Sequence, residues 1–375
     1  MKRVFFYVQH LLGIGHVRRA ATLARVLAAG GFDVLLVSGG APAALDLGGA
    51  RLHQLPAVRA RDEGLRELCR LDGTSLDDTF RAARRKQLLD LFAAEAPHVL
   101  ITEQFPFGRT QLHFELLPLL EAARSMTPRP LIASSVRDVV RRTASSQRIA
   151  ETVGLLEGYD LVMIHADPKL VDFARSFAGW DKIAGRTVYT GYIGEPARAT
   201  DGGAGAGEVI VSVGGGAVGA PLLKAALGAR AASAAAARTW RLLLGDNLPE
   251  VERAALPKGE GIVIEPARPD FTTLLSNAAL SISQAGYNTV VETLCCADRA
   301  VLVPFTTERE TEQSDRALLL AERGIVAMVP AGDLSANTLA AAVDRALAGP
   351  SIRSFPPCDA RGATATVALL QARLT

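Results

Sequence analysis

The stretch SISQAGYNTVVETL, residues 281–294, places three polar side chains at a four-residue spacing. Gln284, Asn288 and Glu292 fall one helical turn apart and so share one face of a helix. A carboxylate and amides on one face suit the hydroxyl groups of a ligand, but a solvated surface helix shows the same pattern. Gly286 stands at the expected start of the helix, where a glycine lets a phosphate approach the first-turn amides. The pattern alone leaves both interpretations open.

A second glycine-rich stretch, SVGGGAVG, covers residues 212–219. Gly214, Gly216 and Gly219 have GxGxxG spacing, directly after an apolar run and before a helical segment. Backbone amides and the helix dipole at such a turn bind phosphate. A dinucleotide site also needs an acidic residue after the next strand, and Asp246 comes late for that role. The stretch therefore favours a phosphate more than it favours NAD.

A third stretch, Gly13-Ile-Gly15-His16, follows the first apolar run of the chain. His16 falls at the expected start of a helix, whose partial positive charge lowers the pKa of an imidazole. A neutral histidine at a ligand site is able to act as a general base. A capping or packing role for His16 is the alternative.

These residues all follow apolar runs that we predict to be buried parallel strands, because the runs are continuous rather than alternating. Helix-length segments separate most of the runs, as in a doubly wound α/β unit. The predicted strands are 3–9, 33–38, 51–55, 98–103, 131–135, 161–165 and 187–191, then 209–213, 239–245, 261–265, 279–283, 300–304 and 324–329.

The pattern stops at residues 195–208, which are rich in glycine and alanine, and then restarts. We therefore predict two Rossmann-like domains with a cleft between them: residues 1–194, the linker 195–208, residues 209–357, and a helix within 358–375 that returns to the first domain. Ligands of such sheets bind beyond the carboxyl ends of the strands. Glu103, Arg109, Arg137 and Asp138 also follow strands, so they are candidates for the same edge; an ion pair or a helix cap is the alternative.

The order of residues in the second half resembles a known family. Gln284-Ala-Gly286-Tyr287-Asn288-Thr289, then Glu292, Pro304-Phe305 and Glu312-Gln313 is similar to the nucleotide-sugar signature of GT-B glycosyltransferases, especially glycosyltransferase family 28. The glycine-rich loops ending in His16 and spanning 214–219 also match that family. The resemblance implies a GT-B fold, and this chain is identified as a divergent member of the family.

The resemblance also implies roles for individual residues. His16 is expected to be the catalytic base, and Gly13 and Gly15 are expected on the acceptor side. The family pattern matches less there, and Glu103, Arg109 and Arg137 are expected on the acceptor side because they follow strands of the first domain. The residues expected to bind the donor are Gly214, Gly215, Gly216, Gly219, Arg268, Gln284, Gly286, Tyr287, Asn288, Thr289, Glu292, Glu312 and Gln313. Gln284 departs from the family, where many relatives carry a cationic residue, and Arg268 or the Gly214 loop is expected to compensate.

The expected activity is inverting, metal-independent transfer of a sugar from a nucleoside-diphosphate sugar, most simply a UDP-sugar, to an acceptor hydroxyl. No cofactor is expected beyond the donor substrate. A nucleotide-sugar 2-epimerase of the same fold, an NAD-binding oxidoreductase and a non-catalytic sugar-binding scaffold are the alternatives. The acceptor is expected to be a saccharide, a lipid-linked molecule or a small molecule.

Composition limits the remaining classes. The net charge of +2 argues against nucleic acid as a partner. No apolar run reaches the roughly 18 residues of a membrane span, so we expect a cytoplasmic protein. Basic clusters at 18–19, 84–86 and 141–142 are expected to be solvated faces, with peripheral membrane contact as the alternative. The four cysteines lack metal-site spacing and are expected to be free thiols.

Overall fold

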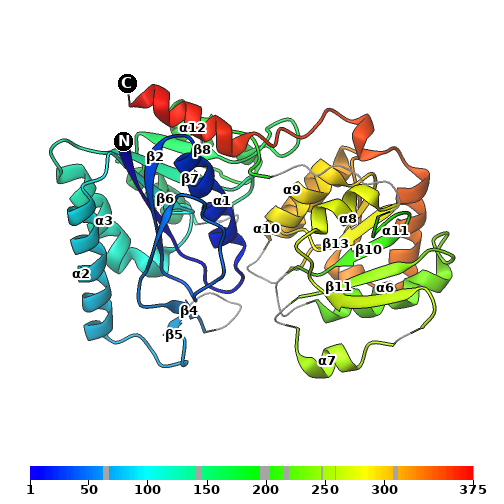
Figure 1. Ribbon diagram of the computed structural model, residues 1–375. Coiled ribbons are helices and arrows are strands. Elements are labelled where there is room, and N and C mark those ends of the chain that lie inside the picture. Colours follow the sequence, from blue (N-terminus) through cyan, green and yellow to red (C-terminus); the bar gives the residue numbers. More distant parts are fainter. Residues whose placement is uncertain are drawn as a thin grey trace. The chain divides into compact units, whose positions relative to one another are not determined.

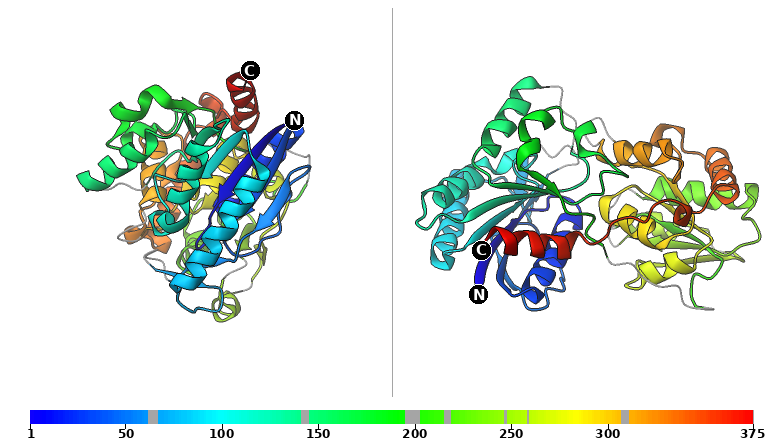
Figure 2. Two further views of the ribbon diagram at one scale, coloured as in Figure 1. Left: turned by 90° about the vertical axis from the view of Figure 1, so that its left-hand side faces the viewer. Right: turned by 90° about the horizontal axis from the view of Figure 1, so that it is seen from above.

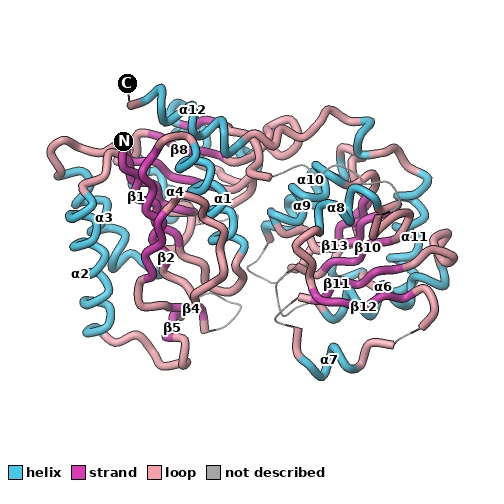
Figure 3. Tube along the Cα trace, viewed as in Figure 1, coloured by secondary structure: helices cyan, strands magenta, loops and turns pink. Residues whose placement is uncertain are grey.

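The chain divides into two compact units in a computed structural model that describes residues 1–61, 67–140, 145–194, 203–214, 219–245, 248–257, 259–306 and 311–374. Unit 1 comprises Met1–Pro168, Asp172–Ile193 and Arg361–Thr375, and unit 2 comprises Lys169–Val171 and Gly194–Ala360. Strands and helices alternate along most of each unit (Figure 3). Of the predicted linker, residues 195–202 lie outside the described part of the chain.

Unit 1 is built on a seven-stranded sheet with the spatial order β3-β2-β1-β6-β7-β8-β9, in which all neighbours are parallel. Its strands are β1 (Lys2–Val8), β2 (Phe32–Ser38), β3 (Arg51–Gln54), β6 (Val99–Glu103), β7 (Leu131–Val136), β8 (Leu161–Ile164) and β9 (Thr187–Tyr189). A small antiparallel pair, β4 (Val58–Ala60) and β5 (Leu68–Arg70), was not expected from the sequence.

Helices cover both faces of this sheet, which explains why its strands are apolar throughout. Val4, Phe6 and Val8 of β1 belong to the core that includes α1 and α12, whereas Phe5 stacks edge-on against Phe92 of α2 with ring centroids 5.1 Å apart. The α-helices of unit 1 are α1 (Gly15–Ala29), α2 (Asp78–Glu95), α3 (His113–Ser125), α4 (Ser146–Leu156), α5 (Trp180–Ile183) and α12 (Gly362–Arg373).

Helix α12 packs against α1 although it comes from the other end of the sequence (Figures 1 and 2). The Gln371 side-chain amide donates to the Gly30 carbonyl at 3.0 Å. A Cβ placed on Gly30 would lie 2.5 Å from a methyl of Val367, so the two helices approach closely where α1 ends. Residues from both ends of the sequence therefore complete one core.

Unit 2 repeats the architecture with a six-stranded parallel sheet in the order β12-β11-β10-β13-β14-β15. Its core joins Val209, Val211 and Val213 to apolar residues of α6 and α11. The elements are β10 (Val209–Ser212), α6 (Ala220–Ala232), β11 (Trp240–Leu244), α7 (Glu250–Ala254), β12 (Ile262–Pro266), α8 (Phe271–Asn277), β13 (Leu280–Ser283), α9 (Tyr287–Cys296), β14 (Ala300–Leu302), α10 (Glu312–Glu322), β15 (Ala327–Met328) and α11 (Ala336–Ala348).

The two parallel sheets confirm the predicted α/β class. In each sheet the strand order reverses beside the first strand, between β1 and β6 in unit 1 and between β10 and β13 in unit 2. Loops leave such a point in opposite directions and open a crevice for ligands at the carboxyl ends of the strands. These two switch points are therefore the places to look for a site.

The basic clusters are not uniformly solvated, and for two arginines that expectation is wrong. Arg19 is buried in an ion pair with Glu103, and Arg84 is buried in an ion pair with Glu115. Both guanidinium groups therefore belong to the interior of unit 1 rather than to a basic surface. The cluster at 141–142 lies outside the described residues.

Two further expectations concern helices and cysteines. Among the described residues, no helix is long and apolar enough to cross a membrane. All four cysteines lie in the described part of the chain and are free thiols, as predicted, with Cys295 Sγ 3.8 Å from Cys358 Sγ.

Candidate functional site

The switch point of unit 1 brings His16 and Glu103 together. His16 is the second residue of α1, and Glu103 is the last residue of β6. His16 Nδ1 lies 3.0 Å from Glu103 Oε1, and the histidine side chain is 12% exposed while the carboxylate is fully buried. A carboxylate only accepts hydrogen bonds, so it fixes the imidazole proton on Nδ1 and leaves Nε2 with its lone pair.

The surroundings favour the neutral form of His16. Burial is the main cause that holds the pKa of His16 well below its ordinary value, and the charges of Arg137 and Arg109 lower it further. The sequence predicted this direction from the helix N-terminus alone, whereas burial and the arginines dominate. The Glu103 carboxylate beside His16 also pairs with the buried Arg19. The arrangement is that of a base held unprotonated near neutral pH.

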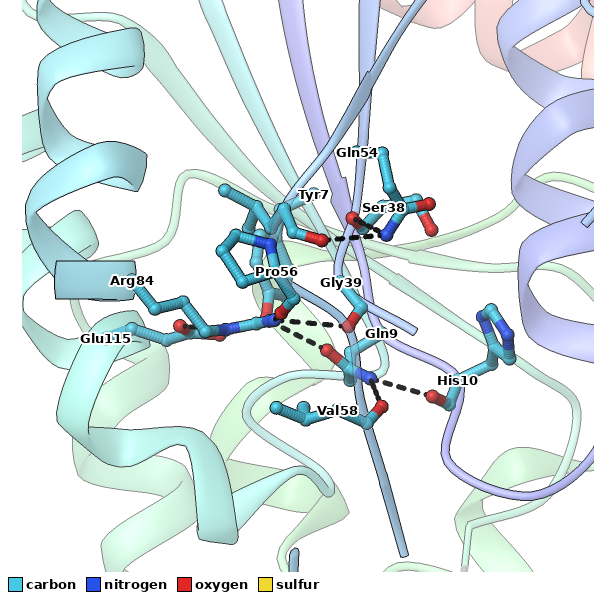
Figure 4. Close-up of polar contacts among 11 residues, drawn as sticks. Tyr7, Gln9, His10, Ser38, Gly39, Gln54, Pro56, Val58, Arg84 and Glu115 are labelled. Carbon is cyan, nitrogen blue, oxygen red and sulfur yellow. Dashed lines mark hydrogen bonds and ion pairs between the residues drawn. The ribbon is translucent and has the colours of Figure 1, made fainter. Parts of the chain in front are cut away.

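A buried polar cluster holds the loop between β1 and α1 (Figure 4). Arg84 of α2 donates to both oxygens of Glu115 of α3 and to Gln9 Oε1 at 2.9 Å. The Gln9 side-chain amide in turn donates to the carbonyls of His10 and Val58 at 2.7 and 3.0 Å. The loop that precedes His16 is therefore tied to a fully buried ion pair.

Arg109 reaches the same loop from beyond β6. Its Nε donates to the Gln9 carbonyl at 2.8 Å, and its backbone takes the left-handed conformation with φ of 67°. Arg137 follows the end of β7, and Gly13 and Gly15 lie on the loop and at the first turn of α1. The structure thus gathers all the predicted acceptor-side residues, with His16, at the carboxyl edge of one sheet.

The switch point of unit 2 places Gly286 at the N-cap of α9, three residues after the end of β13. Glycine has no side chain to cap the helix, so it does not itself occupy the first-turn amide groups. No described atom lies within 4 Å of a Cβ placed on Gly286, and its φ of −61° suits any residue. Neither packing nor backbone conformation among the described residues therefore accounts for a glycine there.

The predicted polar face is present on α9 but is shorter than the spacing indicated. Asn288 and Glu292 are half-buried one turn apart, while Val290 and Val291 are buried. Gln284 is half-buried in the turn before the helix rather than on it, because α9 begins at Tyr287. The simple solvated-face interpretation does not fit two half-buried polar side chains beside a switch point.

Residues of α10 close around the same turn. Arg316 is 1% exposed and donates to the Ala285 carbonyl at 2.8 Å, with its guanidinium 5.8 Å from the ring centroid of Tyr287. Gln313 Oε1 accepts from the Phe305 amide at 3.1 Å, and Glu312 is buried in the first turn. A cation therefore stands beside the Gly286 turn although Gln284 carries no charge.

The remaining donor-side residues lie on other elements. Arg268, beyond β12, makes a two-pronged ion pair with Asp270 and a weaker contact with Glu265. Gly214 follows β10 with φ of +64°, and a Cβ on Gly219 would lie 2.3 Å from Val213, so Gly219 permits close packing at the start of α6. Gly215 and Gly216 lie outside the described residues.

Several residues of these sites were missed by the sequence analysis. Arg19 was treated as surface, although it stands one turn after His16 and faces the same way. Ser135, His165 and Arg316 were not named, because their partners are distant in the sequence and meet them only in the folded unit. A polar residue at the carboxyl end of a buried strand, as at Ser135 and His165, is the pattern that would have drawn attention to them.

Comparison with known proteins agrees with this geometry in unit 2. Residues 210–357 match the glycosyltransferase family 28 C-terminal domain. A curated relative from Burkholderia mallei, the UDP-N-acetylglucosamine--N-acetylmuramyl-(pentapeptide) pyrophosphoryl-undecaprenol N-acetylglucosamine transferase, is 32% identical over 130 residues. That match covers 30% of this chain and 35% of the relative, so it spans about a third of either length.

Solved structures resemble the whole chain. MurG from Acinetobacter baumannii has a TM-score of 0.63 at 18% identity, covering 99% of this chain and all of that one. The spinosyn rhamnosyltransferase SpnG complexed with thymidine diphosphate has a TM-score of 0.60 at 15% identity, with full coverage of both chains. At these identities the likeness establishes the fold, and neither the epimerase nor the oxidoreductase alternative gains support. Residues 210–357 of the second unit match the glycosyltransferase family 28 C-terminal domain, and the chain as a whole has the GT-B fold and resembles the glycosyltransferases of that family.

Proposed function

We propose that the protein is an inverting glycosyltransferase that moves a sugar from a nucleoside-diphosphate sugar, most simply a UDP-sugar, to an acceptor hydroxyl. The observation that carries the proposal is the pair of His16 and Glu103, 3.0 Å apart at the switch point of unit 1. A histidine whose Nδ1 is held by a buried carboxylate presents Nε2 as a base for a hydroxyl proton.

Unit 2 is proposed to bind the donor. The N-terminus of α9 offers amide groups and a partial positive charge to the diphosphate, and the buried Arg316 adds a full charge beside that turn. Glu292, one turn further along the half-buried face, suits the two hydroxyls of a ribose. The family match over 210–357 and the relatives named for UDP-N-acetylglucosamine and thymidine diphosphate support this class of donor.

The proposed reaction is a single displacement. His16 Nε2 takes the proton of the acceptor hydroxyl as its oxygen forms a bond to the anomeric carbon. The bond from that carbon to the diphosphate oxygen breaks on the opposite face, and the nucleoside diphosphate leaves with the electron pair. Inversion follows from one displacement, and the amides of α9 stabilise the charge that develops on the leaving group. In this scheme the charge is neutralised by the helix and Arg316, and no metal ion takes part.

The first test is a thermal-shift panel of nucleotides and nucleotide sugars. A UDP-sugar that binds only the folded state adds about 2.7 kcal/mol at a hundredfold excess over its dissociation constant. The ligands that stabilise are then assayed for UDP release with saccharide, lipid-linked (in vesicles) and small-molecule acceptors. Stabilisation by NAD without UDP, or exchange of the sugar C2 hydrogen without any acceptor, contradicts the proposal.

The second test is His16→Ala. Loss of a general base lowers kcat by about 10²–10⁴-fold, while the thermal shift by the nucleotide remains because unit 2 is unchanged. The matched control is His53→Ala, at a half-buried histidine of β3 that contacts Gln87. An active His16→Ala variant assigns the chemistry to another group.

A further inference from the structure

A chain of buried hydrogen bonds continues from Glu103 away from His16. Ser135 Oγ of β7 donates to Glu103 Oε2 at 2.6 Å. His165 Nε2, directly after β8, lies 3.0 Å from the same Oγ. His165 Nδ1 lies 2.8 Å from Thr190 Oγ1, directly after β9. Ser135, His165 and Thr190 are 1%, 0% and 4% exposed, so the chain runs across the carboxyl edge of the sheet out of contact with water.

The chemistry of the groups fixes where each proton lies. Ser135 has one hydroxyl proton, and Glu103 only accepts, so that proton is directed to the carboxylate. Ser135 Oγ must then accept from His165, which places the histidine proton on Nε2. Burial holds the pKa of His165 well below its ordinary value, so the ring carries this one proton only. His165 Nδ1 then has a lone pair 2.8 Å from Thr190 Oγ1. The carbonyls of Gly191 and Ile164 are also within reach of the Thr190 hydroxyl, at 3.2 and 3.4 Å, but the shorter distance directs its proton to Nδ1.

All donors in the chain consequently point toward Glu103. One carboxylate oxygen receives His16 Nδ1–H and Arg19, and the other receives the Ser135 hydroxyl. With both oxygens engaged from different sides, the carboxylate is fixed in its plane. The Nδ1–H form of His16 depends on that orientation, because a rotated carboxylate does not meet Nδ1.

We propose that Ser135 and His165 are positioning residues that orient Glu103 and thereby hold His16 in the tautomer with a bare Nε2. The catalytic consequence rests on the proposed transferase function, whereas the tautomer does not. Neither residue touches substrate in this scheme. Each acts through the next member of the chain.

The neighbouring Ser134 supplies a matched control. It is on the same strand, is also 0% exposed, and donates to the Phe105 carbonyl at 2.8 Å on the other face of the sheet. Ser134→Ala removes a buried hydroxyl without touching Glu103. Ser135→Ala removes one that does.

The experiment combines the tautomer of His16, from two-bond ¹H–¹⁵N correlations of ¹⁵N-histidine-labelled protein at pH 8, with steady-state kinetics. The wild type and Ser134→Ala are expected to show His16 protonated on Nδ1. Ser135→Ala is expected to show a mixture of tautomers and a kcat about tenfold lower, with an unchanged KM for the nucleotide sugar. Thr190→Val removes the last donor of the chain and is expected to act in the same direction, more weakly.

Two results overturn the proposal: an unaltered His16 tautomer in folded Ser135→Ala and Thr190→Val, or equal effects of Ser134→Ala and Ser135→Ala. A tautomer shift in a protein without transferase activity supports the positioning role and refutes the proposed function instead. Normal transferase activity of the wild type, with no tautomer shift in Ser135→Ala, refutes the positioning role and supports the proposed function. The two failures are therefore distinguishable.

Discussion

The two units have the same architecture but build their candidate sites from different materials. In unit 1 the site consists of side chains held by other buried side chains, with Glu103 receiving bonds from His16 and Arg19 of α1 and from Ser135 of β7. In unit 2 the site consists of a turn and a helix N-terminus, with Gly286 at the N-cap and half-buried polar residues on one face of α9. One site is a side-chain network and the other is largely backbone.

This difference affects how easily each site can be recognised from the sequence. A backbone site needs particular residues close together in sequence, and 284–292 is such a segment. The network of unit 1 draws its members from residues 16 and 19 on α1, 103 on β6, 135 on β7 and 165 directly after β8. The match to the family 28 C-terminal domain, over 210–357, includes the segment 284–292. Distributed side-chain networks leave weak sequence signatures even where the geometry is well defined.

The largest effect is expected from Glu115→Gln, which tests whether unit 1 depends on its buried charges. The change leaves the fully buried Arg84 without its counter-charge and costs about 3–5 kcal/mol of unfolding free energy. Hydrogen exchange is expected to rise in unit 1 and stay constant in unit 2. The control Asp90→Asn breaks the exposed pair with Lys86 and costs about 0.5 kcal/mol or less. An equal loss of protection from hydrogen exchange in both units would contradict the idea that unit 1 alone depends on this buried ion pair.

A smaller effect, on binding, is expected from Glu292→Gln. The variant loses a charged acceptor for two hydroxyls. A hydrogen bond to a charged group contributes about 1.5–3 kcal/mol, so the affinity for the nucleotide sugar is expected to fall by about 10–100-fold. Isothermal titration measures the change. The control is Glu250→Gln, whose side chain is 84% exposed on α7. Unchanged affinity removes Glu292 from the donor site.

Substitutions at two glycines of unit 2 are expected to have different effects, one on the stability of the fold and the other on nucleotide binding. Gly219→Ala places a methyl 2.3 Å from Val213 and is expected to cost about 1–3 kcal/mol of stability. In Gly286→Ala the added methyl group has no described atom within 4 Å, so the stability is expected to stay unchanged. The affinity for the nucleotide is expected to fall severalfold, because the methyl group stands where the diphosphate would approach the helix. Thermal unfolding and nucleotide titration of both variants measure these changes. A stable Gly286→Ala variant with full affinity indicates that the diphosphate does not approach that turn.

The smallest effect per residue concerns pH and is confined to unit 1. All six histidines lie within residues 1–193. The folded pKa values of His16 and His165 are lowered by burial, so below about pH 6.5 the unfolded state binds more protons and stability falls as pH falls. At pH 6 each contributes a loss of about 1 kcal/mol or less. Hydrogen exchange at pH 7.5 and pH 6 is expected to weaken unit 1 selectively, and a uniform response contradicts this.

Much of the fold was predictable because its signals are local. Each of the parallel strands coincides with an apolar run, within three residues at either end. The small β4–β5 pair was missed because a short strand with one exposed face, such as Val58–Ala60, carries almost no pattern. The expected start of α9 at Gly286 agrees with the structure, where Gly286 is the N-cap, but the assignment of Gln284 to the helical face was wrong. Spacing places Gln284 on a helix, but the chain remains in a turn until Gly286.

The candidate sites were predictable only in part, for a physical reason. His16 and Glu103 were each named from their place after a strand, but their pairing depends on β1 and β6 being neighbours in the sheet, which sequence order does not state. Arg19 and Arg84 were placed at the surface because a charge is normally solvated. Only the partner carboxylates, Glu103 and Glu115, make their burial understandable.

The packing of α12 on α1 has a consequence for how the polypeptide is made. Ribosomal synthesis delivers residues 194–360, and with them everything unit 2 contains after residue 171, before it delivers residues 361–375. The side of α1 near Gly30 cannot pack against α12 until residues 361–375 have been synthesised. The part of the protein that is translated first is thus completed last, and the usual N-terminal-first order of domain folding is reversed on that side.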